Sequence, residues 1–343
     1  MAQTISVAVN GYGVIGKRVA DAVRVQPDMQ LVGVGDVTAD YRVKAAVSQE
    51  ISVFAATHDS EAVMRDADLP VAGHLHDLLD QVDVVVDATP SGIGASNFDH
   101  YREHGVKAIF QGGERHALTG HSFVAHVNFD TARGLDATRV VSCNTTATVR
   151  TLAALRNADL LSRARGVLIR RATDPWESDH SGIMNTVVPE SSIPSHQGPD
   201  AQTVIPELDV MTIAAKGSHT QNHAHFWTVE LTRAAGRDEI VRALRAMPRV
   251  AFIRHSDGVV ALNSVIELMR DLGRSRGDMY EVALWEDILT VQDKELFFVS
   301  AVDNQAIVVP ETIDAVRALA GGSTAEESTR ITDATLGIRT DFV

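Results

Sequence analysis

The fold of this chain is decided near its N-terminus, where residues 5–16 read ISVAVNGYGVIG. The first five residues form the apolar run of a buried strand, and residues 17–23 continue with a helical pattern. The spacing G-x-G-x-x-G stands between them. Gly11 permits a tight turn, Gly13 lets the backbone approach a pyrophosphate, and Gly16 lets the helix pack closely on the strand. The segment therefore predicts a dinucleotide-binding fold with the pyrophosphate at the helix N-terminus.

A second strand is expected over residues 30–35, and it ends at Asp36. Asp36 lies twenty residues beyond Gly16, where an acid would bind the ribose 2′-hydroxyl of NAD. An ordinary loop or helix-capping acid is the alternative for this residue. The position favours NAD as the cofactor, with NADP as the alternative.

The remaining pattern predicts an α/β protein of two domains. Strand and helix patterns alternate over residues 1–142, which predicts a doubly wound parallel sheet, the Rossmann dinucleotide-binding domain. Beyond Cys143 the strands and helices indicate an α+β catalytic domain with a mixed or antiparallel sheet, over residues 143–302. A helical region within 303–343 is expected to return to the first domain.

Composition is that of an enzyme rather than a nucleic-acid or disulfide-rich protein. The chain has 343 residues, 45% of them hydrophobic, and a formal net charge of −14, which argues against a nucleic-acid partner. A single cysteine excludes an internal disulfide framework. No signal peptide or membrane span is evident, so we expect a cytoplasmic protein without a membrane partner.

That single cysteine, Cys143, follows a strand-forming run over residues 138–141 and precedes a helical pattern. A thiol at such a junction faces the positive end of the helix dipole and free backbone N–H groups, which lower a thiol pKa and can hold an oxyanion. The alternative is a small buried core residue. Polar neighbours on both sides, Ser142 and Asn144, favour a nucleophile.

Several segments together resemble those of the archaeal-type (type II) glyceraldehyde-3-phosphate dehydrogenases, nearly end to end. The markers are the glycine-rich segment 9–19 and residues 26–29 (QPDM), 87–90 (DATP), 110–114 (FQGGE), 142–146 (SCNTT), 169–172 (IRRA), 194–196 (PSH) and 309–311 (VPE). The resemblance implies a homotetramer of Rossmann and catalytic domains that performs a phosphorylating, two-step oxidation of an aldehyde.

The resemblance also implies a mechanism. The Cys143 thiolate attacks glyceraldehyde 3-phosphate, hydride leaves to the nicotinamide, and inorganic phosphate attacks the resulting thioester to give 1,3-bisphosphoglycerate, reversibly. The base would be His223, the first histidine of a His-x-His pair that ends at His225. Such a pair can bind zinc, but the sequence offers no convincing third ligand, so we expect no metal. Asn144 and the backbone behind it would hold the oxyanion.

Anion binding is expected at Arg170 and Arg171, because guanidinium groups match phosphate oxygens. On an alternating strand only one of the two faces inward, and a solvated strand edge is the alternative for both. The residues expected to bind the cofactor are Gly11, Tyr12, Gly13, Val14, Ile15, Gly16, Asp36, Thr89, Pro90, Gln111, Gly112, Gly113 and Thr312. Those expected to bind substrate or phosphate are Thr145, Arg170, Arg171, Ser195, His196 and His219.

Four departures from the usual family pattern bear on the substrate and the cofactor. Residues 218–222 read SHTQN where the family usually has PTTLM, which makes this loop polar. Gln197 stands where a second histidine is usual, and Thr312 where an asparagine normally helps place the nicotinamide carboxamide. Asp36 replaces a lysine that favours NADP in many members. Another anionic aldehyde, a phosphonate or a different sugar phosphate, is therefore an alternative substrate.

Two other functional classes fit parts of the pattern. An acyl-phosphate reductase of the semialdehyde dehydrogenase kind has a similar cysteine context, but segments 111–114 and 170–171 fit that class poorly. A dinucleotide-binding sensor without turnover has no need of both Cys143 and His223. The sequence therefore favours an aldehyde oxidoreductase.

Overall fold

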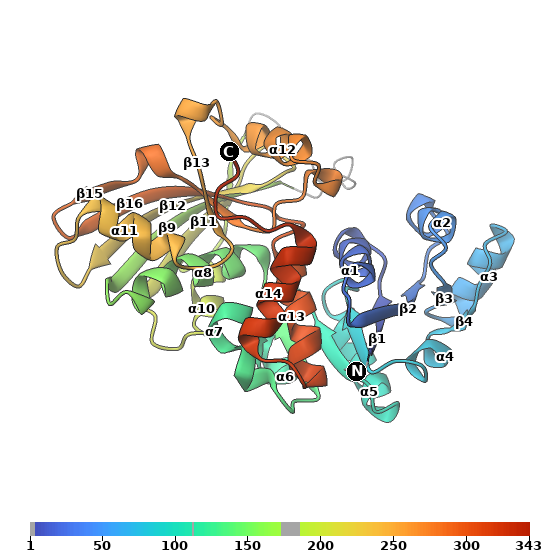
Figure 1. Ribbon diagram of the computed structural model, residues 1–343. Coiled ribbons are helices and arrows are strands. Elements are labelled where there is room, and N and C mark those ends of the chain that lie inside the picture. Colours follow the sequence, from blue (N-terminus) through green and yellow to red (C-terminus); the bar gives the residue numbers. More distant parts are fainter. Residues whose placement is uncertain (1–3, 112, 173–185) are drawn as a thin grey trace. The chain divides into compact units, whose positions relative to one another are not determined.

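The structure, a computed structural model, describes residues 4–111, 113–172 and 186–343. The chain divides into two compact units (Figure 1). Unit 1 comprises Met1–Ser142 and Val309–Gly337, and unit 2 comprises Cys143–Val308 and Ile338–Val343.

The C-terminal boundaries of these units differ from the expected return of residues 303–343 to the first domain. Residues 303–308 belong to unit 2, because the Asp303 carboxylate accepts the N–H groups of Met279, at 2.9 Å, and Gln305, at 2.7 Å. Residues 338–343 also belong to unit 2, where the Arg339 N–H donates to Glu281. The contacts of Asp303 with Met279 and of Arg339 with Glu281 join segments far apart in sequence, so no local pattern predicts them.

Unit 1 is built on a sheet in which every described pair of strands is parallel, which confirms the predicted doubly wound fold. The strands, in the order in which they pair, are β4 (Gly73–His74), β3 (Val53–Ala55), β2 (Met29–Asp36), β1 (Ile5–Asn10), β5 (Val84–Asp87), β6 (Lys107–Phe110), β8 (Ala137–Val140) and β7 (Ser122–Phe123). Since β2 and β5 lie on opposite sides of β1, the strand order reverses there, and ligands bind at such switch points.

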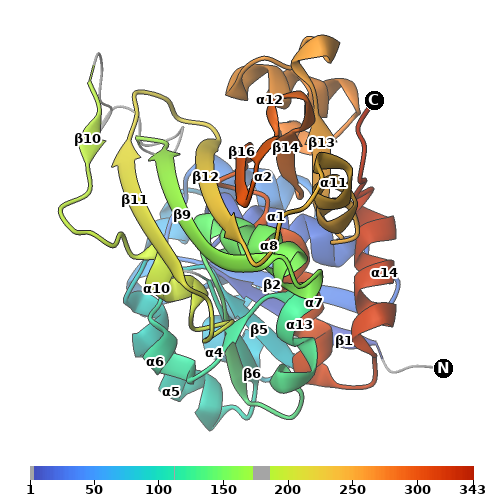
Figure 2. The ribbon, with the colours of Figure 1, turned by 90° about the vertical axis from the view of Figure 1, so that its left-hand side faces the viewer.

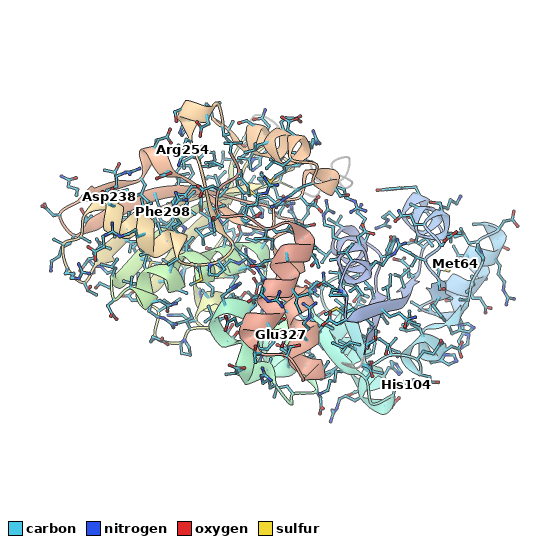
Figure 3. All side chains as sticks on the ribbon, in the orientation of Figure 1. Met64, His104, Asp238, Arg254, Phe298 and Glu327 are labelled. Carbon is cyan, nitrogen blue, oxygen red and sulfur yellow. The ribbon has the colours of Figure 1, made fainter. Side chains whose placement is uncertain are left out.

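Helices lie between these strands along the chain, and two more belong to this unit near the C-terminus. They are α1 (Val14–Arg24), α2 (Tyr41–Ser48), α3 (His58–Asp66), α4 (Leu75–Leu79), α5 (Ile93–Glu103), α6 (His116–Thr119), α7 (Ala125–Asn128), the 3₁₀ turn η1 (Phe129–Ala132), α13 (Val308–Ala320) and α14 (Ala325–Leu336). Met64 on α3 is fully buried, whereas Glu327 on α14 is exposed (Figure 3). The expected final helical region is two helices, interrupted at Gly321 and Gly322, which both have positive φ.

Unit 2 is built on a mixed sheet, as predicted; β11 and β9 pair in parallel, while β12 pairs antiparallel with β9 and β16 (Figure 2). The strands, in pairing order, are β10 (Val188–Pro189), β11 (Val210–Lys216), β9 (Leu161–Arg170), β12 (His223–Leu231), β16 (Glu295–Val302), β14 (Val282–Trp285) and β13 (Val250–Ile253), with β15 (Thr290–Gln292) on β16. The helices are α8 (Cys143–Asn157), α10 (Gln197–Ala201), α11 (Arg237–Arg245) and α12 (Leu262–Asp271), with the 3₁₀ turns η3 (His255–Asp257), η4 (Ser275–Gly277) and η5 (Glu286–Ile288).

The two faces of this mixed sheet differ in burial. Along β12, His223, His225 and Trp227 are buried, while Phe226 and Thr228 are exposed. This alternation places both histidines on one face of the strand, together with Trp227. Helices α8 and α10 pack on the sheet at β9 and β11, and Trp227 stacks on Phe298 of β16. No helix in the described part of the chain is long and apolar enough to cross a membrane.

Candidate active site

Cys143 and His223 lie together in unit 2. Cys143 is the first residue of α8, after Val141 and Ser142 have followed the end of β8, and it is partly exposed. His223 is the first residue of β12 and is 2% exposed. Its Nε2 is 3.3 Å from the Cys143 sulfur. Of the two histidines in the pair, the structure therefore brings the first to the thiol.

The other ring nitrogen of His223 meets the backbone of β9. The main-chain N–H of Arg171, the residue after the end of that strand, donates to His223 Nδ1 at 3.0 Å. This contact follows from strand pairing, because β9 and β12 are neighbours and Ile169 is paired with Ala224. The ring is thus held at both nitrogens, with Cys143 on one side and Arg171 on the other.

The surroundings of this pair favour uncharged forms. Burial lowers the pKa of His223 well below its usual value, and the nearby charges of Arg171 and Arg170 lower it further. Burial also raises the pKa of the Cys143 thiol, although Arg171 and Arg170 act in the opposite direction. The sequence led us to expect a lowered thiol pKa. That expectation was wrong in direction, because the loss of solvent outweighs the two cations and the helix N-terminus.

His225 holds Asn144 rather than the thiol. The ring is fully buried, and its Nε2 donates to Asn144 Oδ1 at 2.8 Å. Since an amide oxygen can only accept, the ring proton of His225 lies on Nε2. Burial lowers the pKa of His225 to about 3, so it stays neutral at physiological pH. The contact fixes the amide of Asn144, with its oxygen toward His225.

On the substrate side, Arg170 and His196 share a carboxylate. Arg170 forms an ion pair with Glu190, and His196 Nδ1 lies 3.6 Å from the same carboxylate. Glu190 was not predicted, and no sequence signal marks it, since it follows the short strand β10 in a loop. Arg170 therefore already has an anionic partner within the protein.

Two residues expected to bind phosphate are buried with partners inside unit 2. The Thr145 hydroxyl donates to Asp200 at 2.8 Å, and the Ser195 hydroxyl donates to that of Thr212 at 2.7 Å. Both side chains are fully buried. These contacts favour a positioning role for Thr145 and Ser195, fastening α10 to α8 and β11.

His219 lies in the polar turn before β12. Its Nε2 donates to the carbonyl oxygen of Asn222 at 3.0 Å, and its own carbonyl accepts the N–H of Ala172. Asn222 has a φ of 61°, in the left-handed region that asparagine tolerates better than an apolar residue. At position 222, the backbone conformation therefore explains why a polar residue, asparagine, stands in this turn.

In unit 1 the glycine-rich loop lies where the sequence predicts it, and Asp36 holds it. The Asp36 carboxylate accepts the Tyr12 N–H at 2.7 Å through one oxygen, and the Thr38 N–H and hydroxyl at 2.9 Å through the other. A Cβ on Gly16 would lie 1.8 Å from the Gly11 carbonyl oxygen, so glycine is required there. A Cβ on Gly13 would meet only Arg42, at 3.8 Å, which leaves the space above Gly13 open. The partly exposed Val14 and Ile15 begin α1.

The next two strand ends form a second set of loops. Thr89 donates from its N–H and hydroxyl to the buried Asp87, which also accepts from Tyr101, and Pro90 follows in the exposed turn. The Ser91 hydroxyl donates to the Gly113 carbonyl at 2.6 Å, which ties the loops after β5 and β6 together. Gly112 lies outside the described residues.

Gln111 follows β6 at the same edge of the sheet. Its Nε2 donates to the hydroxyl of the buried Thr312 on α13, at 3.0 Å. Its Oε1 is buried and has no hydrogen-bond partner among the described residues. A buried amide oxygen without a partner is costly unless a ligand or water satisfies it. This oxygen is thus a candidate contact for a bound cofactor.

Comparison with known proteins yields two family matches and close relatives. Residues 142–287 match the family described as glyceraldehyde 3-phosphate dehydrogenase, C-terminal domain, and residues 5–112 match dihydrodipicolinate reductase, N-terminus. Proteins named glyceraldehyde-3-phosphate dehydrogenase are 43% identical in Methanothermobacter thermautotrophicus, over 92% of this chain and 94% of that protein, and 42% identical in Haloarcula marismortui, over 97% and 94%. The one from Thermococcus kodakarensis is 42% identical over 97% and 99%. Among the described residues, no group of three or more His, Cys, Asp or Glu is placed to hold a metal.

Proposed function

The chain belongs to the archaeal-type glyceraldehyde-3-phosphate dehydrogenase family, and from that premise we propose that it oxidises glyceraldehyde 3-phosphate to 1,3-bisphosphoglycerate through a thioester on Cys143. The observation that carries the proposal is the 3.3 Å contact between the Cys143 sulfur and His223 Nε2 at the N-terminus of α8. A thiol, an imidazole and a helix N-terminus together supply a nucleophile and a place for developing negative charge.

In the proposed reaction the Cys143 thiolate attacks the aldehyde carbon, so a C–S bond forms and the carbonyl electron pair moves to oxygen. A bound nicotinamide supplies the acceptor for the hydride that leaves this carbon, which becomes a thioester. An oxygen of inorganic phosphate then attacks the carbonyl carbon, the C–S bond breaks, and sulfur leaves as the thiolate. His223 and the amide of Asn144, which His225 orients, stabilise the charge on sulfur and oxygen.

Arg171 and Arg170 are proposed to bind the phosphate groups, with His196 and His219 at the edge of the same region. Both arginines act electrostatically on Cys143, which supports their presence near the reacting atoms. Because Arg170 is paired with Glu190, Arg171 is the stronger candidate for the substrate anion. An anion bound remotely also orients the aldehyde carbon against the thiol.

The cofactor is a nicotinamide dinucleotide, and the residues at the strand ends of unit 1 fit it. The open space at Gly13 suits a pyrophosphate at the N-terminus of α1. The unpartnered Oε1 of Gln111 suits an amide N–H of the carboxamide, with Thr312 fixing the orientation of Gln111. Asp36 stands at the end of β2, where a carboxylate would bind the ribose hydroxyls and repel a 2′-phosphate, so we propose NAD as the preferred form.

The test is a rapid-mixing experiment with NAD and glyceraldehyde 3-phosphate in the absence of phosphate. The expected result is a burst of one NADH per Cys143, followed by turnover only when phosphate is added. Intact-protein mass spectrometry should then find the acyl group on wild type and none on Cys143→Ser. Turnover at an equal rate without phosphate, or no burst with any aldehyde, would contradict a phosphorylating thioester enzyme.

A second candidate substrate is a different anionic aldehyde processed by the same chemistry. Gln197 supports it, because this residue is fully buried and neither polar atom of its side chain has a partner in the described part of the chain. The same assay with other sugar phosphates and phosphonoaldehydes, now with phosphate present, gives kcat/KM for each aldehyde. The aldehyde with the highest kcat/KM identifies which candidate substrate is correct.

We also propose a homotetramer in a reducing, cytoplasmic setting. The outer face of the mixed sheet exposes Val167, Ile213 and Phe226, each 45% exposed, beside a hollow of 340 Å³. Contiguous exposed apolar surface of this kind is typical of subunit interfaces. A cytoplasmic setting keeps the single reactive thiol reduced.

A further inference from the structure

Glu190 is held beside Arg170 by the pairing of three strands. Strand β9 ends at Arg170, which pairs with Lys216 of β11, and Lys216 in turn pairs with Val188 of β10. The N–H of Glu190, the residue after β10, donates to the carbonyl oxygen of Ala214 at 2.9 Å. The backbone at Glu190 is therefore fixed to β11, and its carboxylate contacts the Arg170 guanidinium group.

The ion pair between these two side chains is largely withdrawn from solvent. The Arg170 side chain is 21% exposed and the Glu190 side chain 17%, so each charge needs an opposite charge beside it. A guanidinium group has five N–H donors. Glu190 accepts from Nη1, while the buried Nε of Arg170 has no partner in the described part of the chain. Arg170 therefore has a buried donor left for a further acceptor.

The Arg170 guanidinium group also acts on the thiol of the candidate active site. Burial raises the pKa of Cys143, and the charges of Arg171 and Arg170 oppose that effect. On the outer side of the ion pair stands His196, whose side chain is 58% exposed and whose Nδ1 lies 3.6 Å from the second carboxylate oxygen of Glu190. The Glu190 carboxylate therefore bridges an exposed imidazole and a cation that acts on the thiol.

A phosphate group that binds Arg170 competes with this carboxylate. Phosphate and carboxylate oxygens are both anionic acceptors for the same planar set of donors. If Glu190 moves away, its ion pair with Arg170 is lost, and if it stays, two anions share one cation and repel each other. In both cases the negative charge of Glu190 weakens the binding of the phosphate group, because part of the binding free energy is spent on this carboxylate.

We propose that Glu190 is an affinity-determining residue of this site, whose carboxylate occupies Arg170 in the empty enzyme and opposes the phosphate group that binds there. That phosphate belongs to the aldehyde or is the inorganic phosphate that attacks the thioester, and this part rests on the function proposed above. A carboxylate that weakens binding before and after the reaction raises KM and favours release of the phosphorylated product. In the absence of an anion, it keeps the largely buried Arg170 paired.

The test is a titration of the full chain with inorganic phosphate, followed by ³¹P NMR in the absence of cofactor and aldehyde. Glu190→Gln keeps the size of the side chain and removes its charge, so it should bind phosphate about tenfold more tightly than wild type, a difference of about 1.4 kcal/mol. If Glu190 only supported the structure, its replacement would instead weaken phosphate binding. Unchanged or weaker binding in Glu190→Gln would therefore overturn the proposal.

Two further variants show whether the gain in affinity comes from Arg170. Glu207→Gln is the matched control for net charge, because Glu207 is 65% exposed and pairs with Arg156 in the same unit, and it should bind phosphate as wild type does. The double variant Glu190→Gln/Arg170→Ala has the net charge of wild type and no released guanidinium group, so its affinity should return to the wild-type value. An equal gain in Glu207→Gln, or a gain retained in the double variant, would contradict the competition at Arg170.

Steady-state kinetics of Glu190→Gln identify which phosphate Glu190 opposes. A lower KM for inorganic phosphate assigns the site to the attacking phosphate, and a lower KM for glyceraldehyde 3-phosphate assigns it to the substrate. Wild-type values of both KM would overturn the role in the reaction. The titration needs no turnover, so a failed NADH burst would reject the thioester function while the phosphate affinities still decide the competition. If Glu190→Gln does not fold, Glu190→Asn removes the same charge and serves in its place.

Discussion

Cys143 carries the clearest expectation for a single residue. Cys143→Ser should lower kcat by several powers of ten, because a serine alkoxide is far less accessible than a thiolate near pH 7. NADH binding, measured by fluorescence titration, should be retained, since the glycine-rich loop belongs to unit 1. Because burial raises the thiol pKa, the wild-type rate should increase between pH 7 and 9. Near wild-type turnover in the serine variant would rule out the thioester.

The two arginines after β9 should differ in their effect. Arg171→Ala should lower kcat/KM for the phosphorylated aldehyde roughly a hundredfold, because a charge-assisted contact is worth about 3 kcal/mol. The same change should have little effect on kcat/KM for a neutral aldehyde of similar size. Arg171→Lys should retain only part of the kcat/KM for the phosphorylated aldehyde, since lysine lacks the paired donors of a guanidinium group. Arg170→Ala should cost less, because Arg170 is paired with Glu190. Equal losses for charged and neutral aldehydes would remove the anion-binding assignment.

Asp36 should set the preference for NAD. Asp36→Asn removes the charge, so it should narrow the NAD/NADP ratio of kcat/KM. It keeps only one acceptor oxygen, so the hydrogen bonds to Tyr12 and to Thr38 cannot both be retained and the affinity for both dinucleotides should also fall. Asp36→Lys should shift the ratio toward NADP by at least about tenfold, which needs 1.4 kcal/mol. A wild type that prefers NADP would instead point to Thr38 or Arg42 as the group that reads the phosphate.

At the residue scale, the sequence led to the pairing of Cys143 with His223, which lie 3.3 Å apart, but not to the contacts that hold them. Cys143 and His223 could be chosen in advance from a strand–helix junction and a family motif. The bond from Arg171 to His223 could not, because it depends on the register between β9 and β12, strands that are more than fifty residues apart. Burial reversed the expected direction of the thiol pKa for the same reason, since long-range packing supplies it.

Helix α13 offers a prediction at the scale of an element. Arg317 on this helix is fully buried, and its guanidinium donates to Asp28 twice at 2.7 Å and to Gln26 at 2.7 Å. Arg317→Met should lower the free energy of unfolding by about 3–5 kcal/mol in urea denaturation, because it leaves Asp28 and Gln26 without their hydrogen-bond donor. Arg330→Met on the exposed side of α14 should change it by less than about 0.5 kcal/mol. Similar losses in both variants would show that the buried contacts are not the cause.

The same contact makes the stability of unit 1 depend on pH. Burial alone would raise the pKa of Asp28, but the hydrogen bonds and charge of Arg317 lower it below its ordinary value of 3.8. A carboxyl with a lowered folded pKa stabilises the fold above its unfolded pKa, and the contribution is lost as pH falls through the folded value. The loss of stability below about pH 4 should therefore be steeper in wild type than in Arg317→Met.

Elements with strong local patterns were predicted, and those fixed by neighbours were not. Strands β1, β5, β6 and β16 follow apolar runs that the sequence displays. Strand β11 was missed, although Asp209 precedes its sequence VMTIAAK and Gly217 follows it; the strand gains its place by pairing with β9. Strand β12 begins at His223, because the turn at Asn222 precedes it.

For the whole molecule, the prediction concerns assembly. Phe226→Glu on the outer face of the mixed sheet should break up the homotetramer, because it places a charge on the apolar surface around Val167 and Ile213. The measurement is the mass in solution by light scattering after gel filtration. Val260→Glu is the matched control, since Val260 is 60% exposed, lies before α12 and does not line the hollow beside Phe226. A tetramer in both variants would move the interface elsewhere.

The boundary between the two units falls on the peptide bond between Ser142 and Cys143. The groups proposed to bind the dinucleotide precede it or return after it in α13, while the thiol, both histidines and the two arginines follow it. The halves even match families with different descriptions. Such a division lets the two halves diverge at different rates during evolution. Substitutions in unit 1 that change the preferred dinucleotide leave Cys143 unchanged. Substitutions in unit 2 that admit another aldehyde leave most of the residues proposed to bind the dinucleotide unchanged.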